Sequence, residues 1–185
     1  MVENNKETLP IQKLVIALVA VVLGVVLVIS TKSTLKQESL ETQAASSTPL
    51  EVALSNGKPS MIEFYAPWCT TCQMMAGDLA SLKKEYEGKV NFVMLNVDNS
   101  NWLPEILKYD VNGIPHFVFL NFRGEAVGQA IGEQPLAVLK ANLEALVASQ
   151  PLPYNNSRGS TSGFNPQSQL QQGNRENPTN HGHPH

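Results

Sequence analysis

Residues 64–72 read FYAPWCTTC and contain both cysteines of a 185-residue chain, Cys69 and Cys72. A disulfide between two cysteines this close together closes a short loop and constrains the unfolded chain little. A small secreted domain that depends on disulfides for its stability needs several pairs. We therefore expect this pair to serve chemistry, as a dithiol that passes electrons.

The stretch joins a predicted strand to a predicted helix. Residues 60–66 (SMIEFYA) have the composition of a strand. The segment from Thr71 to Tyr86 has apolar residues at helical spacing, namely Met74, Met75, Leu79, Leu82 and Tyr86. The dithiol therefore lies at the carboxyl end of a strand, where open α/β sheets place their sites.

The globular region, residues 49–150, continues this alternation of helices and strands. The further predicted helices are 49–55, 101–109 and 134–147, and the further predicted strands are 90–97, 116–120 and 126–131. A parallel βαβ unit with a right-handed crossover is followed by an antiparallel hairpin. The order predicts an α/β fold with a central mixed sheet flanked by helices.

The spacing of the cysteines assigns each sulfur a role. A helix that begins at or just after Cys69 places that sulfur at its amino terminus, where unpaired N–H groups and the helix dipole stabilise a thiolate. Cys72 lies one turn further on and is expected to be the more sheltered of the two. We expect Cys69, exposed at the helix tip, to attack a substrate disulfide and Cys72 to resolve the mixed disulfide.

Two neighbouring side chains are candidates for supporting roles. Glu63 lies six residues before Cys69 and is expected to point beneath the helix, where burial would raise its pKa and let it relay a proton to or from Cys72. The alternative for Glu63 is a solvated strand residue. Trp68 is expected to shield the dithiol and contact the substrate, with simple packing as the alternative.

Gly113-Ile114-Pro115 precedes a predicted strand and forms a tight turn. Cis peptide bonds occur almost only before proline and in such turns, which makes the Ile114–Pro115 bond a candidate for the cis form. This turn would leave the backbone of Ile114 free to pair with an extended substrate peptide.

The flanks of the globular region differ from it in composition. After the N-terminal segment 1–10, residues 11–30 are long and apolar enough for a transmembrane helix. A cleaved signal peptide and a buried soluble helix are the alternatives. Residues 31–48 are predicted to be a polar spacer. Residues 151–185, rich in Asn, Gln, Ser, Gly and Pro, are predicted to be a disordered tail.

Composition argues against two other classes of function. The net charge is −3 and the basic residues are scattered, so no nucleic-acid partner is expected. A structural zinc site needs four ligands, and the cysteine pair supplies two. The histidines at 181, 183 and 185 lie far along the predicted tail, and no metal site or other cofactor is expected.

The motifs FYAPWCTTC, NVD and GIPHFVF, in this order and at this separation, resemble the thioredoxin superfamily over residues 49–149. KVNFVMLNVDN, GIPHF and PLPY carry a closer resemblance to the membrane-anchored thioredoxin-like proteins of cyanobacteria and plastids, the TxlA type of thiol:disulfide interchange protein. The resemblance implies a thioredoxin fold with Cys69 as nucleophile, Cys72 as resolving cysteine and Pro115 cis. It also implies that Gly132 lies with Ile114 beside the substrate groove.

Some positions depart from the common thioredoxin pattern. Thr70-Thr71 stands between the cysteines in place of Gly-Pro, and His116 follows the proline in place of threonine. Met94 stands where thioredoxins usually carry a lysine near the buried acid. Glu63 is therefore expected to lack a charged partner.

The resemblance also implies a function and a location. The chain is expected to be a membrane-anchored thiol:disulfide oxidoreductase that reduces disulfides of proteins of cytochrome assembly. Its domain would lie on the lumenal or periplasmic side of a thylakoid or plasma membrane, and its electrons would come from a membrane donor of the thiol-transporting type. A dithiol oxidase or isomerase and a non-catalytic membrane-tethered binding module are the alternatives. The uncharged residues between the cysteines favour the reductase, because an oxidase needs a strongly stabilised reduced form.

Overall fold

The computed structural model describes residues 13–23, 39–164 and 166. The chain divides into two compact units, residues 1–37 and 38–185, and each is considered by itself. In the first unit residues 13–23 are helical. The large apolar side chains of this helix are each more than half exposed.

The predicted transmembrane helix falls only partly within this description. No helix among the described residues is long and apolar enough to cross a membrane. Outside the described residues lie the predicted segment 1–10, residues 11–12 and 24–30 of the predicted span, residues 31–38 of the predicted spacer, and residues 165 and 167–185 of the predicted tail.

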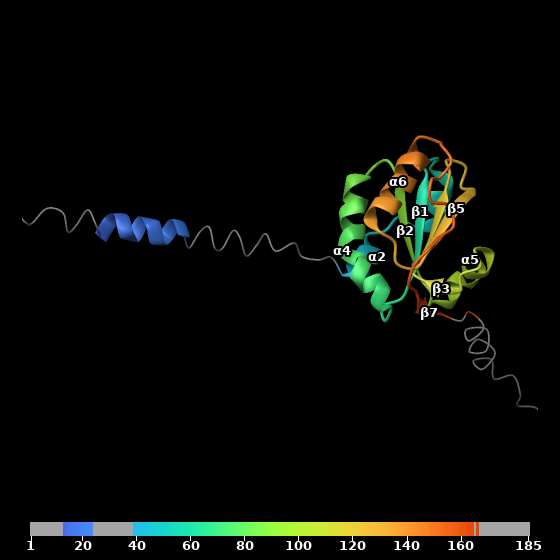
Figure 1. Ribbon diagram of the computed structural model, residues 1–185, viewed down its shortest axis with the longest axis horizontal. Coiled ribbons are helices and arrows are strands. Elements are labelled where there is room, and N and C mark those ends of the chain that lie inside the picture. The colour runs from blue at the N-terminus through green and yellow to red at the C-terminus, as the bar shows by residue number, and fades with distance from the viewer. Residues whose placement is uncertain (1–12, 24–38, 165, 167–185) are drawn as a thin grey trace, which may run out of the picture. The chain divides into compact units, whose positions relative to one another are not determined.

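The second unit contains the predicted α/β domain (Figure 1). Its helices are α2 (Leu40–Ala45), α3 (Leu50–Ser55), α4 (Thr70–Glu85), α5 (Leu103–Lys108) and α6 (Leu136–Val147), with a 3-10 turn η1 (Ser100–Trp102). Its strands are β1 (Ser60–Tyr65), β2 (Asn91–Asn96), β3 (Gly113–Ile114), β4 (His116–Leu120), β5 (Ala126–Ile131), β6 (Ser157–Arg158) and β7 (Ser162–Gly163). The helices and strands predicted within residues 49–150 are all present, with small shifts at their ends.

The main sheet has the strand order β2-β1-β4-β5-β6. β1 and β2 are parallel, as the βαβ pattern predicts, and β4 and β5 form the expected antiparallel hairpin. The second sheet pairs β3 with β7. Figure 1 shows β3, β7 and α5 grouped at one end of the domain.

Alternating side chains of the central strands separate two cores, one on each face of the sheet. Ile62 and Phe64 of β1 pack in the core that includes residues of α2, α3 and α5. Met61 of β1 and Phe117 of β4 pack in the core formed with α4 and α6. This arrangement is a thioredoxin fold, and Ala66 and Cys69, which lie between β1 and α4, are buried in the first of these cores.

The spacer prediction is wrong from residue 39 onward, because helix α2 belongs to the domain. Ser39 caps α2 by accepting a hydrogen bond from the N–H of Thr42. Leu40 and Gln43 are buried, and the side-chain amide of Gln43 donates to the carbonyl oxygen of Ala76 in α4 at 2.9 Å. Contacts with residues distant in sequence stabilise this helix. Its own sequence is polar, so hydrophobic periodicity does not predict it.

The tail prediction is wrong for residues 151–164, which hold strands β6 and β7. β6 pairs in parallel with β5, and β7 pairs in antiparallel fashion with β3. These pairings use backbone groups, which every non-proline residue carries regardless of how apolar its side chain is. Composition alone therefore could not reveal them.

Candidate active site

The two cysteines meet at the start of α4, just after the carboxyl end of β1. Cys69 and Cys72 form a disulfide with their Cα atoms 5.2 Å apart. Cys69 is the N-cap residue of α4, and its sulfur accepts a hydrogen bond from the N–H of Cys72 at 3.1 Å. A thiolate at this position would keep that bond and face the positive end of the helix dipole, so the geometry favours thiol–disulfide exchange through Cys69.

The expectation that Cys69 is exposed is wrong for this disulfide form. Both cysteines have 0% of their surface exposed and belong to the core cluster that contains Ile114. Phe164, from the segment predicted to be disordered, packs against the same cluster. The position of Cys69 at the helix start is confirmed, but neighbouring residues cover its sulfur in this structure.

Trp68 directly precedes Cys69 and is hydrogen-bonded to Asp98 of the NVD motif. Its side chain is 49% exposed, and its indole N–H donates to the two carboxylate oxygens of Asp98 at 2.9 and 3.2 Å. Asp98 follows β2, where its backbone N–H donates to the side-chain oxygen of Asn96. An exposed ring fixed in orientation is available for contact with a protein, and a role in substrate binding stays a prediction. Sequence analysis assigned no role to Asp98, although the NVD motif contains it.

The turn before β4 has the predicted geometry. The Ile114–Pro115 peptide bond is cis. Gly132 lies next to it, and its N–H donates to the carbonyl oxygen of Pro115 at 2.7 Å. Gly132 has φ +81°, and a Cβ atom there would lie 2.4 Å from the carbonyl oxygen of Gly159, so no larger residue fits.

The expectation that the backbone of Ile114 is free for a substrate is wrong in this structure. Ile114 of β3 pairs with Ser162 of β7. The side-chain oxygen of Ser162 also lies 3.5 Å from that of Thr71, in the first turn of α4. A segment of the chain itself therefore occupies the edge on which a substrate peptide is expected to bind.

Glu63 is fully buried, as predicted, with 0% of its surface exposed. Burial raises the pKa of its carboxyl, and the nearby charge of Lys83 and the hydrogen bond from Lys83 oppose that rise. Among the described residues, its Oε1 atom has no hydrogen-bond partner. A carboxyl in this state is suited to hold and release a proton, while its transfer of a proton to Cys72 stays a prediction.

The expectation that Glu63 lacks a charged partner is wrong, because Lys83 reaches it from α4. The Nζ atom of Lys83 lies 3.4 Å from Oε2 of Glu63. Lys83 also donates to the side-chain oxygen of Gln43 at 2.9 Å and lies 3.0 Å from the sulfur of Met94. Sequence analysis missed Lys83 because it lies twenty residues from Glu63; the signal for it was a lysine on a helix that packs over a buried acid.

His116, the residue after the cis proline, is buried and uncharged at neutral pH. Burial lowers its pKa, and its Nε2 atom is hydrogen-bonded to the side-chain oxygen of Gln129 at 2.7 Å. The side-chain amide oxygen of Gln129 can only accept, so Nε2 of His116 carries the proton. Its ring makes an edge contact with Phe64, with 5.9 Å between ring centroids. His116 therefore packs and adds no positive charge near the dithiol.

Replacing His116 with phenylalanine is expected to change how stability depends on pH. Below pH 6.5 the histidine of the unfolded chain takes up a proton while the buried one does not, so the wild type loses stability as the pH falls toward the folded pKa. Within that window each pH unit costs at most about 1.4 kcal/mol, and His116→Phe avoids this loss. Urea unfolding of both proteins from pH 8 to 5 measures it, and parallel curves would contradict a buried neutral His116.

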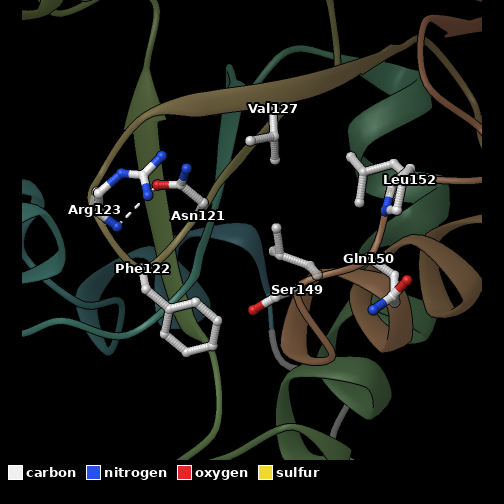
Figure 2. A pocket seen from close by; sticks show the side chains of 9 residues that line it. Asn121, Phe122, Arg123, Val127, Ser149, Gln150 and Leu152 are labelled. Carbon is white, nitrogen blue, oxygen red and sulfur yellow. Dashed lines mark hydrogen bonds between the residues drawn. The ribbon is translucent and has the colours of Figure 1, made fainter.

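A separate cavity of about 370 Å³ lies away from the dithiol. Figure 2 shows Phe122, Val127 and Leu152 around it, beside the turn between β4 and β5. Because Ser60 at the start of β1 pairs with Leu120 at the end of β4, this turn lies at the opposite end of the sheet from Cys69. The cavity therefore takes no part in dithiol chemistry.

Within residues 13–23, 39–164 and 166, no group of three or more His, Cys, Asp or Glu residues is arranged to hold a metal ion. The histidines at 181, 183 and 185 lie outside the described residues.

A family model and several proteins of known name match this chain. Residues 41–145 match the protein-family model described as Thioredoxin. A protein of Synechocystis sp. named Thiol:disulfide interchange protein TxlA homolog is 53% identical over 152 residues, which cover 82% of this chain and 84% of the relative. Thiol:disulfide interchange protein TxlA of Synechococcus elongatus is 44% identical over 181 residues, covering 98% of this chain and 95% of the relative. The chloroplastic thioredoxin-like protein HCF164 of Arabidopsis thaliana is 48% identical over 117 residues, covering 63% of this chain and 45% of the relative.

Proposed function

The chain belongs to the thioredoxin family and is a thiol:disulfide oxidoreductase of the TxlA type, and from that premise we propose that it is a membrane-anchored reductase of protein disulfides. The observation that carries the proposal is the Cys69–Cys72 disulfide at the amino terminus of α4, with Cys69 as the N-cap residue. This geometry stabilises a thiolate on the sulfur that attacks the substrate.

The proposed reaction moves two electrons from the dithiol to the substrate. The Cys69 thiolate attacks one sulfur of a substrate disulfide, a mixed disulfide forms, and one substrate thiolate leaves. Cys72, after losing its proton, attacks the Cys69 sulfur and releases the second substrate thiol. Glu63 is proposed to accept or return the Cys72 proton, because it is a buried carboxyl with a raised pKa on the strand that leads to the site.

The direction of electron flow is proposed from the charges near the dithiol. A strong oxidase owes its potential to a stabilised thiolate in the reduced form. The residues between the cysteines are Thr70 and Thr71, and His116 is neutral because burial lowers its pKa. None of these three side chains adds positive charge to stabilise a thiolate on Cys69, which favours reduction of substrates over oxidation.

The membrane anchor is proposed from the apolar segment 11–30. In its described part, residues 13–23, the large apolar side chains are more than half exposed and need a nonaqueous partner. We propose that a thylakoid or plasma membrane covers them, with the domain on the lumenal or periplasmic side. Proteins of cytochrome assembly are the proposed substrates, and a thiol-transporting membrane protein is the proposed electron donor.

Trapping with Cys72→Ser tests this function. The variant can attack a substrate but cannot resolve the mixed disulfide, so partners linked to Cys69 are expected to accumulate. The chain and its linked partners are expected to stay in the membrane fraction after an alkaline carbonate wash. The Cys69→Ser/Cys72→Ser double variant is the control and should trap nothing. Equal recovery of partners with both variants would refute the proposed mechanism, and recovery of the chain in the soluble fraction would refute the anchor.

A further inference from the structure

The segment that follows α6 returns to the end of the domain that holds the disulfide. Three backbone hydrogen bonds fasten it along β5 and the loop beyond: from Asn156 to Gln129 at 2.8 Å, from Gly159 to Ile131 at 2.7 Å, and from Glu133 to Ser160 at 2.7 Å. β6 thereby becomes the edge strand of the main sheet. The chain then crosses to β3, where β7 completes the second sheet (Figure 1).

β7 pairs with the backbone of β3, the strand that directly precedes the cis proline. Gly113 pairs with Gly163 and Ile114 with Ser162, in antiparallel register. The approach is close, because a Cβ atom at Gly113 would lie 3.2 Å from the side chain of Thr161. An extended substrate that pairs with Ile114 would need the space that β7 fills.

The same segment touches the surroundings of both cysteines. Ser162 lies 3.5 Å from the hydroxyl of Thr71, which sits between Cys69 and Cys72 in sequence. Phe164 packs against the cluster that contains the two cysteines and Ile114. Since Cys69 has 0% of its surface exposed, the disulfide is closed to a reaction partner in this arrangement.

The segment is held in a way that lets it leave. None of residues 151–164 is buried. Its attachment therefore depends mainly on backbone hydrogen bonds, each with a small net free energy, and less on apolar burial. Segments of this kind open locally without unfolding of the domain.

We propose that residues 157–164 are an internal ligand of the substrate-binding edge, which covers the Cys69–Cys72 disulfide and is displaced when a protein substrate binds. The substrate class follows from the occupant: an extended segment, antiparallel to β3, with small residues opposite Gly113 and Ile114, as Gly163 and Ser162 are here. This proposal rests on the proposed redox function, but it concerns access to the disulfide and can be tested without a protein substrate.

Two glycines of the segment provide a matched pair of variants. A Cβ atom at Gly159 would lie 1.8 Å from the carbonyl oxygen of Glu133, so Gly159→Ala must push the segment off β5. A Cβ atom at Gly163 meets no atom within 4 Å among the described residues, so Gly163→Ala fits in place. Ser162→Pro is a second displacing variant, because it removes the hydroxyl that lies 3.5 Å from that of Thr71 and the backbone N–H of a residue paired with Ile114.

The measurement is the rate at which excess dithiothreitol reduces the disulfide of the oxidised full-length protein, followed by acid quenching, maleimide labelling and mass spectrometry. Gly159→Ala is expected to raise this rate about tenfold, because two backbone hydrogen bonds are worth about that factor in an opening equilibrium. Ser162→Pro is expected to act likewise, and Gly163→Ala should stay within about twofold of the wild type. Far-UV circular dichroism confirms that each variant keeps its fold.

Wild-type reduction rates in either displacing variant would overturn the proposal, as would equal acceleration in Gly163→Ala. Amide hydrogen exchange of Glu133, whose N–H donates to Ser160, shows independently whether the segment has left. Failure of the trapping experiment with unchanged results here would remove the proposed function and leave the covering segment established.

Discussion

Replacing Cys69 with serine is expected to abolish disulfide reduction, whereas replacing Cys72 is expected to spare the first step. Serine keeps the size of the side chain, but its hydroxyl does not ionise near neutral pH, so the attacking group is lost. The rate of insulin disulfide reduction should fall by at least about 10³-fold, the order that loss of a catalytic nucleophile costs other enzymes. Cys72→Ser should form one mixed disulfide per molecule at a measurable rate and then stop.

A difference in stability does not explain a difference in activity between Cys69→Ser and Cys72→Ser, because both variants lose the same disulfide. A loop this short contributes about 2 kcal/mol through the entropy of the unfolded chain, and both variants forgo it equally. Reduced wild type is the reference for unfolding, and single-turnover kinetics with a fluorescent disulfide peptide measure the first step. Mixed-disulfide formation by Cys69→Ser at the rate of Cys72→Ser would reverse the assigned roles.

Replacing Lys83 with methionine is expected to destabilise the domain by up to about 3 kcal/mol at alkaline pH and by less at pH 5. Methionine keeps much of the apolar stem but leaves the Glu63 carboxylate, which has 0% exposed surface, without its charged partner at 3.4 Å. The pKa of Glu63, already raised by burial, should rise further when the opposing effect of Lys83 is removed.

The sign of the pH dependence follows from proton uptake. Well below pH 4.5 the carboxyl is protonated in the folded and the unfolded chain, and Glu63 then contributes no pH-dependent difference. As the pH rises above 4.5, the unfolded chain loses this proton while the folded chain keeps it, so stability falls until the pH passes the folded pKa. Lys83→Met widens that window, and its deficit relative to the wild type therefore grows with pH.

Lys84→Met is the matched control, since Lys84 is the exposed neighbour on the same helix. An exposed substitution of this kind should change stability by less than about 0.5 kcal/mol at any pH. Urea unfolding at pH 5 and pH 8 measures both variants. A loss for Lys83→Met that is the same at the two pH values would show that Lys83 acts through packing of its stem and not through its charge.

For the pair of Glu63 and Lys83, the sequence predicts the burial of Glu63 but not the identity of its partner. Burial of Glu63 followed from its place on a central strand, because alternate residues of such a strand must face a packed helix. The partner did not follow, since Met94 occupies the neighbouring strand position opposite Glu63. A lysine from another element filled the same electrostatic need, and only packing of α4 on the sheet brings it there.

The ends of the domain show the same division. Helix α2 and strands β6 and β7 have polar sequences, so hydrophobic periodicity predicts none of the three. Each is held by partners far along the chain: Gln43 by Ala76, Ser157 by Ala130, and Ser162 by Ile114. The energy that orders these segments is not contained in the segments themselves.

The sequence by itself determined what depends on neighbouring residues: the order of the predicted helices and strands, the start of α4 at Cys69, the pairing of two cysteines three residues apart, and the turn at Pro115. Tertiary structure alone decided that Lys83 serves Glu63, that His116 is buried and neutral, and that residues 157–164 lie over the substrate-binding edge. The reason is physical. Local preferences act within a few residues, whereas burial, charge pairing and strand addition depend on surfaces that exist only after the chain has folded.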